Sequence, residues 1–325
     1  MARTTHPEDP ARTGEKRLDT LDVQATQVAQ DTQAAQIARV GTWLRSADGV
    51  LVVASNGFDI ADGYQQFACD EAFLREFGAF RRAYGLTSMI QGLAARWPSW
   101  EARWAFLARL ISYGYLDYRP SPVMQSVLRI MRDTEHFVVT CNCNGRFERA
   151  GAYQGALFET EGSYARLRCS AGCSDALYDA APVVERLKEG EGGALASDPG
   201  DAPAIPAGLV PRCPRCDAPL DVAVDDRGGL AGAERFQEQQ RRLRAFLDRM
   251  HGKNVVVLEL GMGQRNQAIK APLMRWAAGE PHARYVVINR EPALLPQGMG
   301  ERAQGIVDDL GPVLTVLAVA VEREA

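Results

Sequence analysis

Short apolar runs, each followed by a polar turn, recur along the chain and predict the strands of a buried sheet. These runs are Val50–Ala54, Phe137–Thr140, Val255–Leu260 and Tyr285–Asn289. Runs that are rich in β-branched residues and apolar at every position are typical of parallel strands buried on both faces. Because helical segments separate them, the pattern predicts a doubly wound, Rossmann-like α/β fold.

Helical periodicity accounts for two further segments. Leu21–Ala47 carries apolar residues at helical spacing and predicts a long helix leading into the domain. Asp70–Arg119 contains two apolar helical patterns rich in aromatic residues, which predict a helical insertion at about 70–119 that packs as core. Residues 1–20 are polar and mixed in charge, and we expect a disordered tail there.

The cysteines mark a second, smaller unit inside the Rossmann-like domain. We predict that 21–165 and 218–325 form the large domain and that 166–217 form an inserted module. Within this module, 189–208 is rich in Gly, Ala, Pro and acidic residues, which indicates an exposed loop.

Two closely spaced cysteine pairs predict a zinc-ribbon module. The pairs are Cys169 with Cys173 and Cys213 with Cys216, and four thiolates complete the closed tetrahedral site of structural zinc. Four unrelated buried thiols would leave this paired spacing unexplained. A catalytic zinc is disfavoured because no His or carboxylate completes an open site at this spacing.

Composition and charge narrow the classes of partner. The chain has 325 residues, a hydrophobic share of 46% and a charged share of 24%, as in ordinary globular proteins. The net charge of -4 offers no basic surface for nucleic-acid phosphates. No apolar run has the length of a membrane span and no secretory signal is evident, so we expect a cytoplasmic protein. In a reducing compartment the odd cysteine count argues for metal binding or free thiols over disulfides.

The polar turns after the four predicted strands form the candidate ligand site. They are Ser55–Gly63, Asn142–Gly145, Gly261–Asn266 and Asn289–Glu291. Ligands of open parallel sheets bind beyond the carboxyl ends of the strands. Glycines there let backbone amides approach a diphosphate, and Asn and Asp side chains bond ribose or carboxamide groups. Each turn alone is equally explained by the turn preference of Gly and Asn, but together they predict a nucleotide crevice.

From about Ser46 to the C-terminal end, the ordered motifs resemble sirtuins, in particular the divergent macrodomain-linked class. Val52–Gly63 resembles the strand and diphosphate turn of that family, and Thr140–Asn144 its Thr-x-Asn-x-Asp motif. Phe158–Tyr164 resembles the segment with the catalytic residue, and the cysteine pairs follow in the family's order. Glu259–Gly263 and Ile288–Asn289 resemble the motifs beside the adenine ribose.

The resemblance implies NAD as co-substrate and assigns the site residues. Asn142 would lie beside the nicotinamide ribose, and Glu161 stands at the catalytic position. The implied NAD-binding residues are Ser55, Asn56, Gly57, Asp59, Gly63, Asn144, Gly261, Gly263, Arg265 and Asn289.

Three departures from the family pattern change the expected chemistry. Ser55 and Asn56 replace Gly and Ala of the diphosphate turn, Asn144 replaces the Asp that holds the carboxamide, and Glu161 replaces the catalytic His or Gln. A carboxylate at 161 suits stabilisation of a cationic ribose carbon and proton removal from a hydroxyl, carboxyl or thiol nucleophile.

Several site residues also have structural interpretations. Glu161 can simply accept hydrogen bonds at a loop, Asn142 can stabilise a turn, and Arg265 can be an exposed residue at a helix start. Cys141 and Cys143 flank Asn142, and in an extended segment they would face away from the cleft as inert thiols.

We therefore predict an NAD-consuming enzyme that cleaves the nicotinamide–ribose bond and transfers ADP-ribose to a protein or small-molecule acceptor. An NAD-dependent deacylase or an NAD glycohydrolase is the enzymatic alternative, although the missing His disfavours deacylation. The third hypothesis is a catalytically degenerate sensor or scaffold that binds NAD or another metabolite.

Overall fold

Six parallel strands form the main sheet, in the order β3-β2-β1-β7-β8-β9. The strands are β1 (Gly49–Ala54), β2 (Glu135–Thr140), β3 (Leu157–Glu159), β7 (Val255–Leu260), β8 (Arg284–Asn289) and β9 (Ala303–Val307). The strand order reverses between β1 and β7, which is where open α/β sheets bind ligands. This architecture confirms the predicted doubly wound fold.

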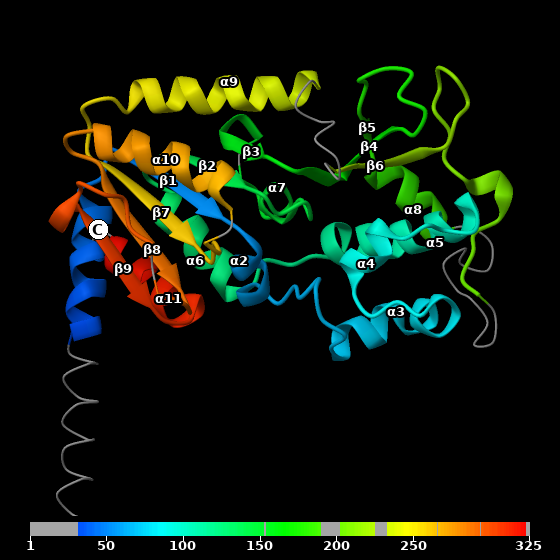
Figure 1. Ribbon diagram of the computed structural model, residues 1–325, viewed down its shortest axis with the longest axis horizontal. Coiled ribbons are helices and arrows are strands. Elements are labelled where there is room, and N and C mark those ends of the chain that lie inside the picture. The colour runs from blue at the N-terminus through cyan, green and yellow to red at the C-terminus, as the bar shows by residue number, and fades with distance from the viewer. Residues whose placement is uncertain are drawn as a thin grey trace, which may run out of the picture.

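The computed structural model describes residues 32–152, 154–189, 202–224, 233–264, 266–292 and 294–322. The predicted disordered tail at 1–20 and residues 190–201 of the predicted exposed loop lie outside this range. Within it, a large lobe surrounds the main sheet and a smaller lobe lies beyond one end of that sheet (Figure 1). None of the described helices is long and apolar enough to cross a membrane.

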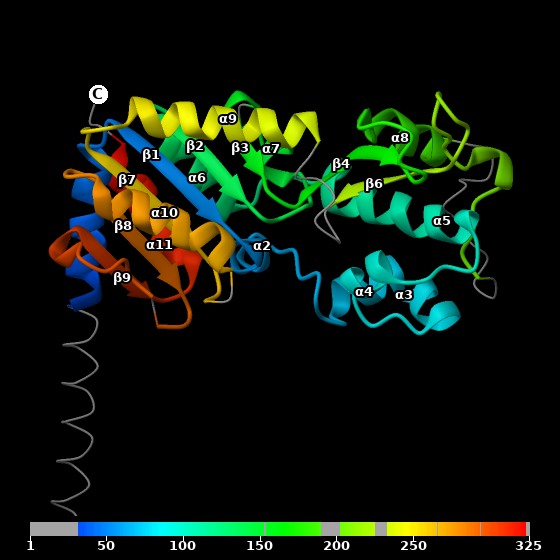
Figure 2. The same cartoon turned by 45° about the horizontal axis from the view of Figure 1, so that its top comes forward.

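Helices cover both faces of the main sheet, which explains why its strands are apolar at successive positions. Leu51 and Val53 of β1 point to one face, where they pack with α9 (Glu234–Arg249) and α10 (Gln267–Gly279). Val50 and Val52 point to the other face, toward a helix over residues 32–45, α6 (Pro122–Met131) and α11 (Leu310–Val321). Figure 2 shows α9 and α10 lying across the first of these faces.

The two edge strands, β3 and β9, were missed in the sequence. β3 has only three residues, and β9 contains Gln304 and Gly305 and is only partly buried. An edge strand pairs on one side only, so it carries a weaker apolar signal than the central strands. The other short elements are α2 (Asn56–Ala61), α7 (Arg146–Arg149) and single helical turns at Gln154–Ala156, Ala207–Leu209 and Gly300–Arg302.

The helical insertion consists of three helices. They are α3 (Glu71–Tyr84), α4 (Met89–Ala94) and α5 (Trp100–Ile111), the last continued by a π-helical turn at Ser112–Leu116. Asp70, Ser88 and Ser99 cap the three N-termini by accepting a hydrogen bond from the backbone N–H three residues ahead. Gly85, with a φ of 70°, ends α3 in the left-handed conformation.

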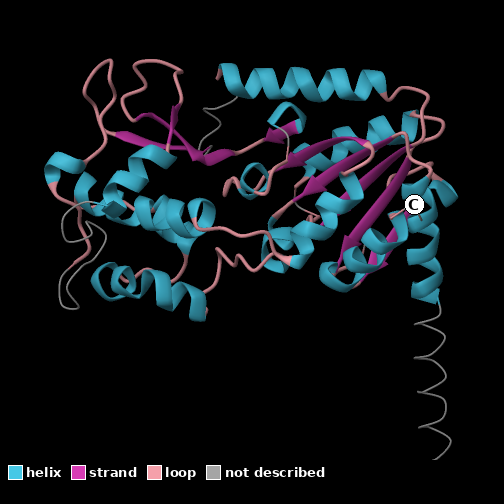
Figure 3. Cartoon of the chain, turned by 180° about the vertical axis from the view of Figure 1, so that it is seen from behind, coloured by secondary structure: helices cyan, strands magenta, loops and turns pink. Residues whose placement is uncertain are grey.

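The cysteine module is built on a small antiparallel sheet of order β5-β4-β6. β4 (Gly162–Cys169), β5 (Tyr178–Asp179) and β6 (Leu220–Val224) are accompanied by α8 (Ala181–Glu189). The sheet extends beyond the predicted boundaries 166–217 at both ends, because β4 and β6 pair along most of their length. Seen from behind, the strands of the two sheets occupy opposite ends of the molecule (Figure 3).

The helical insertion and the cysteine module share one hydrophobic core and together make the small lobe. Trp104 Nε1 donates to the Leu220 carbonyl at 2.8 Å, and Arg103 forms an ion pair with Asp221 at 2.7 Å. Two segments that are far apart in the sequence therefore stabilise each other.

Candidate functional site

The turns after β1 and β7 contact each other through Gly57 and Gly261, at the point where the strand order reverses. The backbone N–H of Gly57 donates to the carbonyl of Gly261 at 2.9 Å. A Cβ atom on Gly57 would lie 2.5 Å from that carbonyl oxygen, and one on Gly261 would lie 2.4 Å from the Gly57 carbonyl carbon. Gly261 also has a φ of 60°. Both positions therefore require glycine.

We expect Gly57→Ala to lower the free energy of unfolding by about 1–3 kcal/mol, because the added methyl group has to displace backbone atoms. Urea denaturation of the variant and of wild type measures the difference. Gly279→Ala is the matched control, since a Cβ atom there meets nothing within 4 Å. Equal stability of Gly57→Ala and wild type would contradict the close packing of the two turns.

A cleft of about 630 Å³ opens beside this contact. Six of the ten residues implied to bind NAD line it, namely Ser55, Asn56, Gly57, Gly261, Gly263 and Asn289. The other polar lining residues are Arg290 and Glu291, from the turn after β8, and Asp308 and Asp309, from the turn after β9. The ends of β1, β7, β8 and β9 thus converge on one cleft. The strand-end argument predicted three of these turns, but the fourth predicted turn, Asn142–Gly145 after β2, does not line the cleft.

Asp308 and Asp309 are the polar lining residues that the sequence interpretation missed. They follow β9, which was not predicted from the sequence, so the turn after it could not be located at the edge of the sheet where ligands bind. Gln33 Nε2 donates to Asp308 Oδ2 at 2.6 Å, and Arg290 forms an ion pair with Asp309. The sequence did contain a signal for this turn, because two adjacent carboxylates stand between the apolar pair Ile306-Val307 and the turn residues Gly311-Pro312.

Asn142 lies directly behind the β1 turn and is 2% exposed. Its Nδ2 donates to the Ser55 carbonyl at 3.0 Å. Its Oδ1 is buried and has no hydrogen-bond partner among the described residues. Buried polar atoms are paired in most native structures, so this oxygen fits a group that is supplied from outside the chain.

The prediction that Cys141 and Asn142 point to opposite sides was wrong, although Cys141 does not line the cleft. The Cys141 thiol donates to Ser55 Oγ at 3.1 Å and accepts from Asn266 Nδ2 at 3.2 Å, so it contacts the same turn as Asn142. The segment after β2 is an irregular loop, and side chains there do not alternate as in a strand. Burial raises the pKa of Cys141 to about 11 and that of Cys143 well above its usual value, which keeps both thiols protonated and unreactive.

Asn144 and Asp59 lie in the polar interior between the two lobes, and each is 3% exposed. Asn144 Nδ2 donates to Asp59 Oδ2 at 2.7 Å. Nearby, Arg146 pairs with Asp62 at 3.0 Å, and its guanidinium lies 4.4 Å from the ring centroid of Tyr64. Burial raises the pKa of Asp59 to about 7 against the hydrogen bond from Asn144 and the charge of Arg146, which both lower it.

Glu161 lies in the turn between β3 and β4 and is exposed. Its backbone carbonyl accepts from the Cys143 thiol at 3.5 Å, and its charge raises the pKa of Cys141 and Cys143. The Glu161 turn therefore lies beside the loop that carries Asn142. Gly63, with a φ of 85°, follows the C-terminal end of α2 and does not line the 630 Å³ cleft. Arg265 lies outside the described residues.

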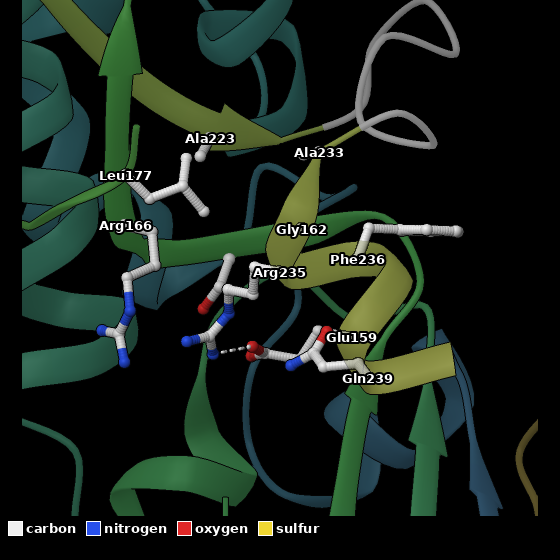
Figure 4. A pocket seen from close by; sticks show the side chains of 10 residues that line it. Glu159, Gly162, Arg166, Leu177, Ala223, Ala233, Arg235, Phe236 and Gln239 are labelled. Carbon is white, nitrogen blue, oxygen red and sulfur yellow. Dashed lines mark hydrogen bonds and ion pairs between the residues drawn. The ribbon is translucent and has the colours of Figure 1, made fainter. Parts of the chain in front are cut away.

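Beneath the Glu161 turn, Glu159 forms the floor of a small pocket together with the start of α9 (Figure 4). Arg235 pairs with Glu159 at 3.2 Å and with Glu148 at 3.4 Å, and Arg166 pairs with Glu148 at 2.7 Å. Burial raises the pKa of Glu159 to about 7, although the charge of Arg235 lowers it.

The raised pKa of Glu159 predicts a pH-dependent stability. The folded chain keeps the Glu159 proton up to about pH 7, whereas the unfolded chain releases it near 4.5, so stability from this group falls as the pH rises between these values. Relative to Glu159→Gln, wild type should lose on the order of 1–3 kcal/mol between about pH 5 and about pH 8. Urea denaturation at both pH values measures this, with the exposed Glu185→Gln as control. A difference that does not vary with pH would be evidence against it.

Glu259 does not reach the cleft, although it belongs to the motif that precedes Gly261. It is fully buried in β7, where it accepts from Lys270 Nζ at 2.6 Å and from Tyr285 OH at 2.7 Å. Lys270 belongs to α10, so the buried pair fixes this helix against the sheet directly behind the Gly261 turn.

The four paired cysteines form a site that fits zinc. Their Sγ atoms all lie within 4.8 Å of one another, with Cys169 and Cys216 at 3.4 Å and Cys173 and Cys213 at 3.6 Å. Zn–S bonds of about 2.3 Å in a tetrahedron place sulfurs about 3.8 Å apart, close to these separations. The backbone N–H of Arg215 lowers the pKa of Cys213 to about 6, whereas hydrogen bonds with Cys216 and Cys213 raise the pKa of Cys173 to about 12.

No protein-family model matches the chain. The chain is similar to a protein ADP-ribosyltransferase of Staphylococcus aureus, with 27% identity over 292 residues that make up 88% of this chain and 87% of that protein. It is also similar to a probable bifunctional ADP-ribose hydrolase/ADP-ribosyltransferase of Fusarium oxysporum f. sp. cubense, with 27% identity over 76% of this chain and 40% of that longer protein.

Solved structures with the same fold are Sir2 proteins. A Sir2 homologue in complex with NAD has a TM-score of 0.54 and 14% identity, and covers 87% of this chain and 93% of its own. A Sir2 homologue mutant in complex with ADP-ribose has a TM-score of 0.54 and 16% identity, and covers 87% of this chain and 95% of its own. These likenesses confirm the predicted fold.

Proposed function

We propose that this chain, which has the Sir2 fold, is an NAD-consuming ADP-ribosyltransferase. The observation that carries the proposal is the 630 Å³ cleft at the switch point of the sheet, lined by six of the predicted NAD-binding residues. The similarity to the Staphylococcus aureus protein ADP-ribosyltransferase over 88% of this chain supports the same reaction. The macrodomain-linked class is the sirtuin class that we infer for it.

The reaction breaks the bond between the ribose C1′ of NAD and the nicotinamide nitrogen. The electron pair of this bond goes to nicotinamide, which leaves as a neutral molecule. An oxygen or sulfur atom of the acceptor forms the new bond to C1′ and gives up its proton. The products are nicotinamide, the ADP-ribosylated acceptor and a proton, and with water as acceptor the product is free ADP-ribose.

We assign the chemical step to Glu161 and the binding of the nicotinamide ribose to Asn142. The exposed Glu161 carboxylate, in the turn beside the Asn142 loop, would stabilise the cationic C1′ and take the proton from the acceptor. Asn142 would bond the nicotinamide ribose through its buried, unpartnered Oδ1, which accepts a hydrogen bond from a hydroxyl group. The zinc site would hold the small lobe together and take no part in the chemistry.

Incubation of the full chain with NAD tests the proposal. Release of nicotinamide, measured chromatographically, is expected in wild type, and label from adenine-labelled NAD should pass to candidate protein or small-molecule acceptors. Label that appears only in free ADP-ribose would identify an NAD glycohydrolase. Removal of acyl groups from lysine peptides would identify the deacylase alternative. Tight NAD binding without nicotinamide release would identify a sensor and contradict the proposed transfer.

We infer that the enzyme acts in the cytoplasm on a protein or small-molecule acceptor, without a nucleic-acid or membrane partner. The seven cysteines, four of them at zinc spacing, suit a reducing compartment. The net charge of -4 opposes binding to nucleic-acid phosphates.

A further inference from the structure

Asn144 stands at the position where the sirtuin pattern has the aspartate that holds the nicotinamide carboxamide. In this chain both ends of its side chain are occupied. Asn144 Oδ1 accepts from the backbone N–H of Arg146 at 3.1 Å, and Asn144 Nδ2 donates to Asp59 Oδ2 at 2.7 Å. The amide of Asn144 therefore holds a carboxylate that comes from another segment, 85 residues earlier in the chain.

Asp59 provides a buried carboxyl group in this region. It is 3% exposed and belongs to α2, which starts in the turn that lines the cleft. Arg146, the cation whose charge acts on Asp59, forms its ion pair with Asp62, at 3.0 Å, and donates a hydrogen bond to the Gly114 carbonyl at 3.1 Å. Arg146 attracts Asp59 only through space, and no ion pair neutralises Asp59 among the described residues.

A second, independent observation indicates that a ligand binds beside this carboxyl group. Asn142, whose side chain also interacts with Asp59, leaves its buried Oδ1 without a partner among the described residues. At 2% exposure, such an atom is costly unless a ligand supplies the donor. A hydroxyl group for Asn142 and an N–H group for Asp59 are what a nicotinamide riboside offers from one molecule.

We propose that Asp59 supplies the carboxylate that the sirtuin pattern carries at position 144, and that it accepts the carboxamide N–H of nicotinamide. The inference rests on the proposed use of NAD. Asn144 then acts as a positioning residue, because it orients Asp59. The carboxyl group of Asp59 lies one hydrogen bond of 2.7 Å from the side chain of residue 144, so the pocket keeps a carboxyl group although residue 144 is an amide.

Binding of NAD and of its 3-acetylpyridine analogue tests the proposal. The analogue has a methyl ketone in place of the carboxamide and offers no N–H group. Calorimetry on the full chain should give wild type a preference for NAD of roughly 10-fold or more, since a charged acceptor loses its donor. Asp59→Ala should bind both dinucleotides with nearly equal, weaker affinity. The exposed Asp133→Ala, at the opposite end of the sheet, should keep the wild-type preference.

The double variant Asp59→Ala/Asn144→Asp separates this role from a structural one. It returns a carboxylate to the pocket but cannot rebuild the hydrogen bond between positions 59 and 144, because alanine has no polar group. Restored preference for NAD in the double variant is expected. The same preference in Asp59→Ala as in wild type would overturn the proposal, as would a double variant that binds like Asp59→Ala.

Two further comparisons keep the test decisive. If Asp59→Ala does not fold, as judged by its thermal transition, Asp59→Leu and Asp59→Leu/Asn144→Asp give the same comparison, because leucine has a similar length and, like alanine, no polar group. A wild type that prefers NAD through Asp59 but releases no nicotinamide would support this inference and contradict the proposed transfer. A wild type that releases nicotinamide with a preference independent of Asp59 would do the reverse.

Discussion

Glu161→Ala should release nicotinamide from NAD at a rate roughly 100-fold or more below that of wild type, because the variant loses the group that accepts the acceptor's proton. Glu161→Gln keeps a polar side chain like that of the macrodomain-linked class and should retain part of the turnover. The Michaelis constant for NAD should change little in either variant, since Glu161 does not line the cleft that would bind most of the dinucleotide.

The control for this experiment is Glu185→Ala, which removes an exposed glutamate from α8 in the small lobe. Its turnover should equal that of wild type. Undiminished nicotinamide release by Glu161→Ala would remove Glu161 from the reaction, and the base would then have to come from another residue.

Loss of zinc should unfold the small lobe. Cys213→Ser removes one ligand of the site, and a chelator removes the metal itself. Cys169 and Cys213 also belong to the hydrophobic core of that lobe. We expect a loss of several kcal/mol, because zinc binding contributes roughly 10 kcal/mol or more to the folding of small zinc modules.

Elemental analysis and tryptophan fluorescence measure this effect. Trp97, Trp100 and Trp104 all pack in the small lobe, so their emission should shift when it unfolds. Cys69→Ser is the matched control, because Cys69 is exposed and lies away from the four ligands. A Cys213→Ser variant with undiminished zinc would rule out this site.

Much of the fold and of the cleft could be predicted because each depends on local sequence. Four strands are buried on both faces and therefore read as unbroken apolar runs, and parallel strands bring the following turns to one edge without further information. The cysteine spacing predicted the site at Cys169 and Cys213 for the same reason, since each half of the site is local.

Features that depend on contacts between distant segments could not be predicted. The hydrogen bond from Asn144 to Asp59 joins residues 85 positions apart, and no sequence pattern around either residue indicates which side chain it contacts. The sequence pattern likewise treated the helical insertion and the cysteine module as separate units, although Trp104 and Leu220 bond across their shared core. Asp308 and Asp309 were missed because an edge strand precedes them.

The composite small lobe has a consequence for the order in which the protein matures on the ribosome. α3 and α5 are synthesised more than a hundred residues before β6, the strand whose Leu220 accepts from Trp104. Until that strand emerges, the aromatic face of these helices lacks its partner and is open to association with other nascent chains. Chaperone dependence during translation is therefore expected to centre on the interval between these two segments.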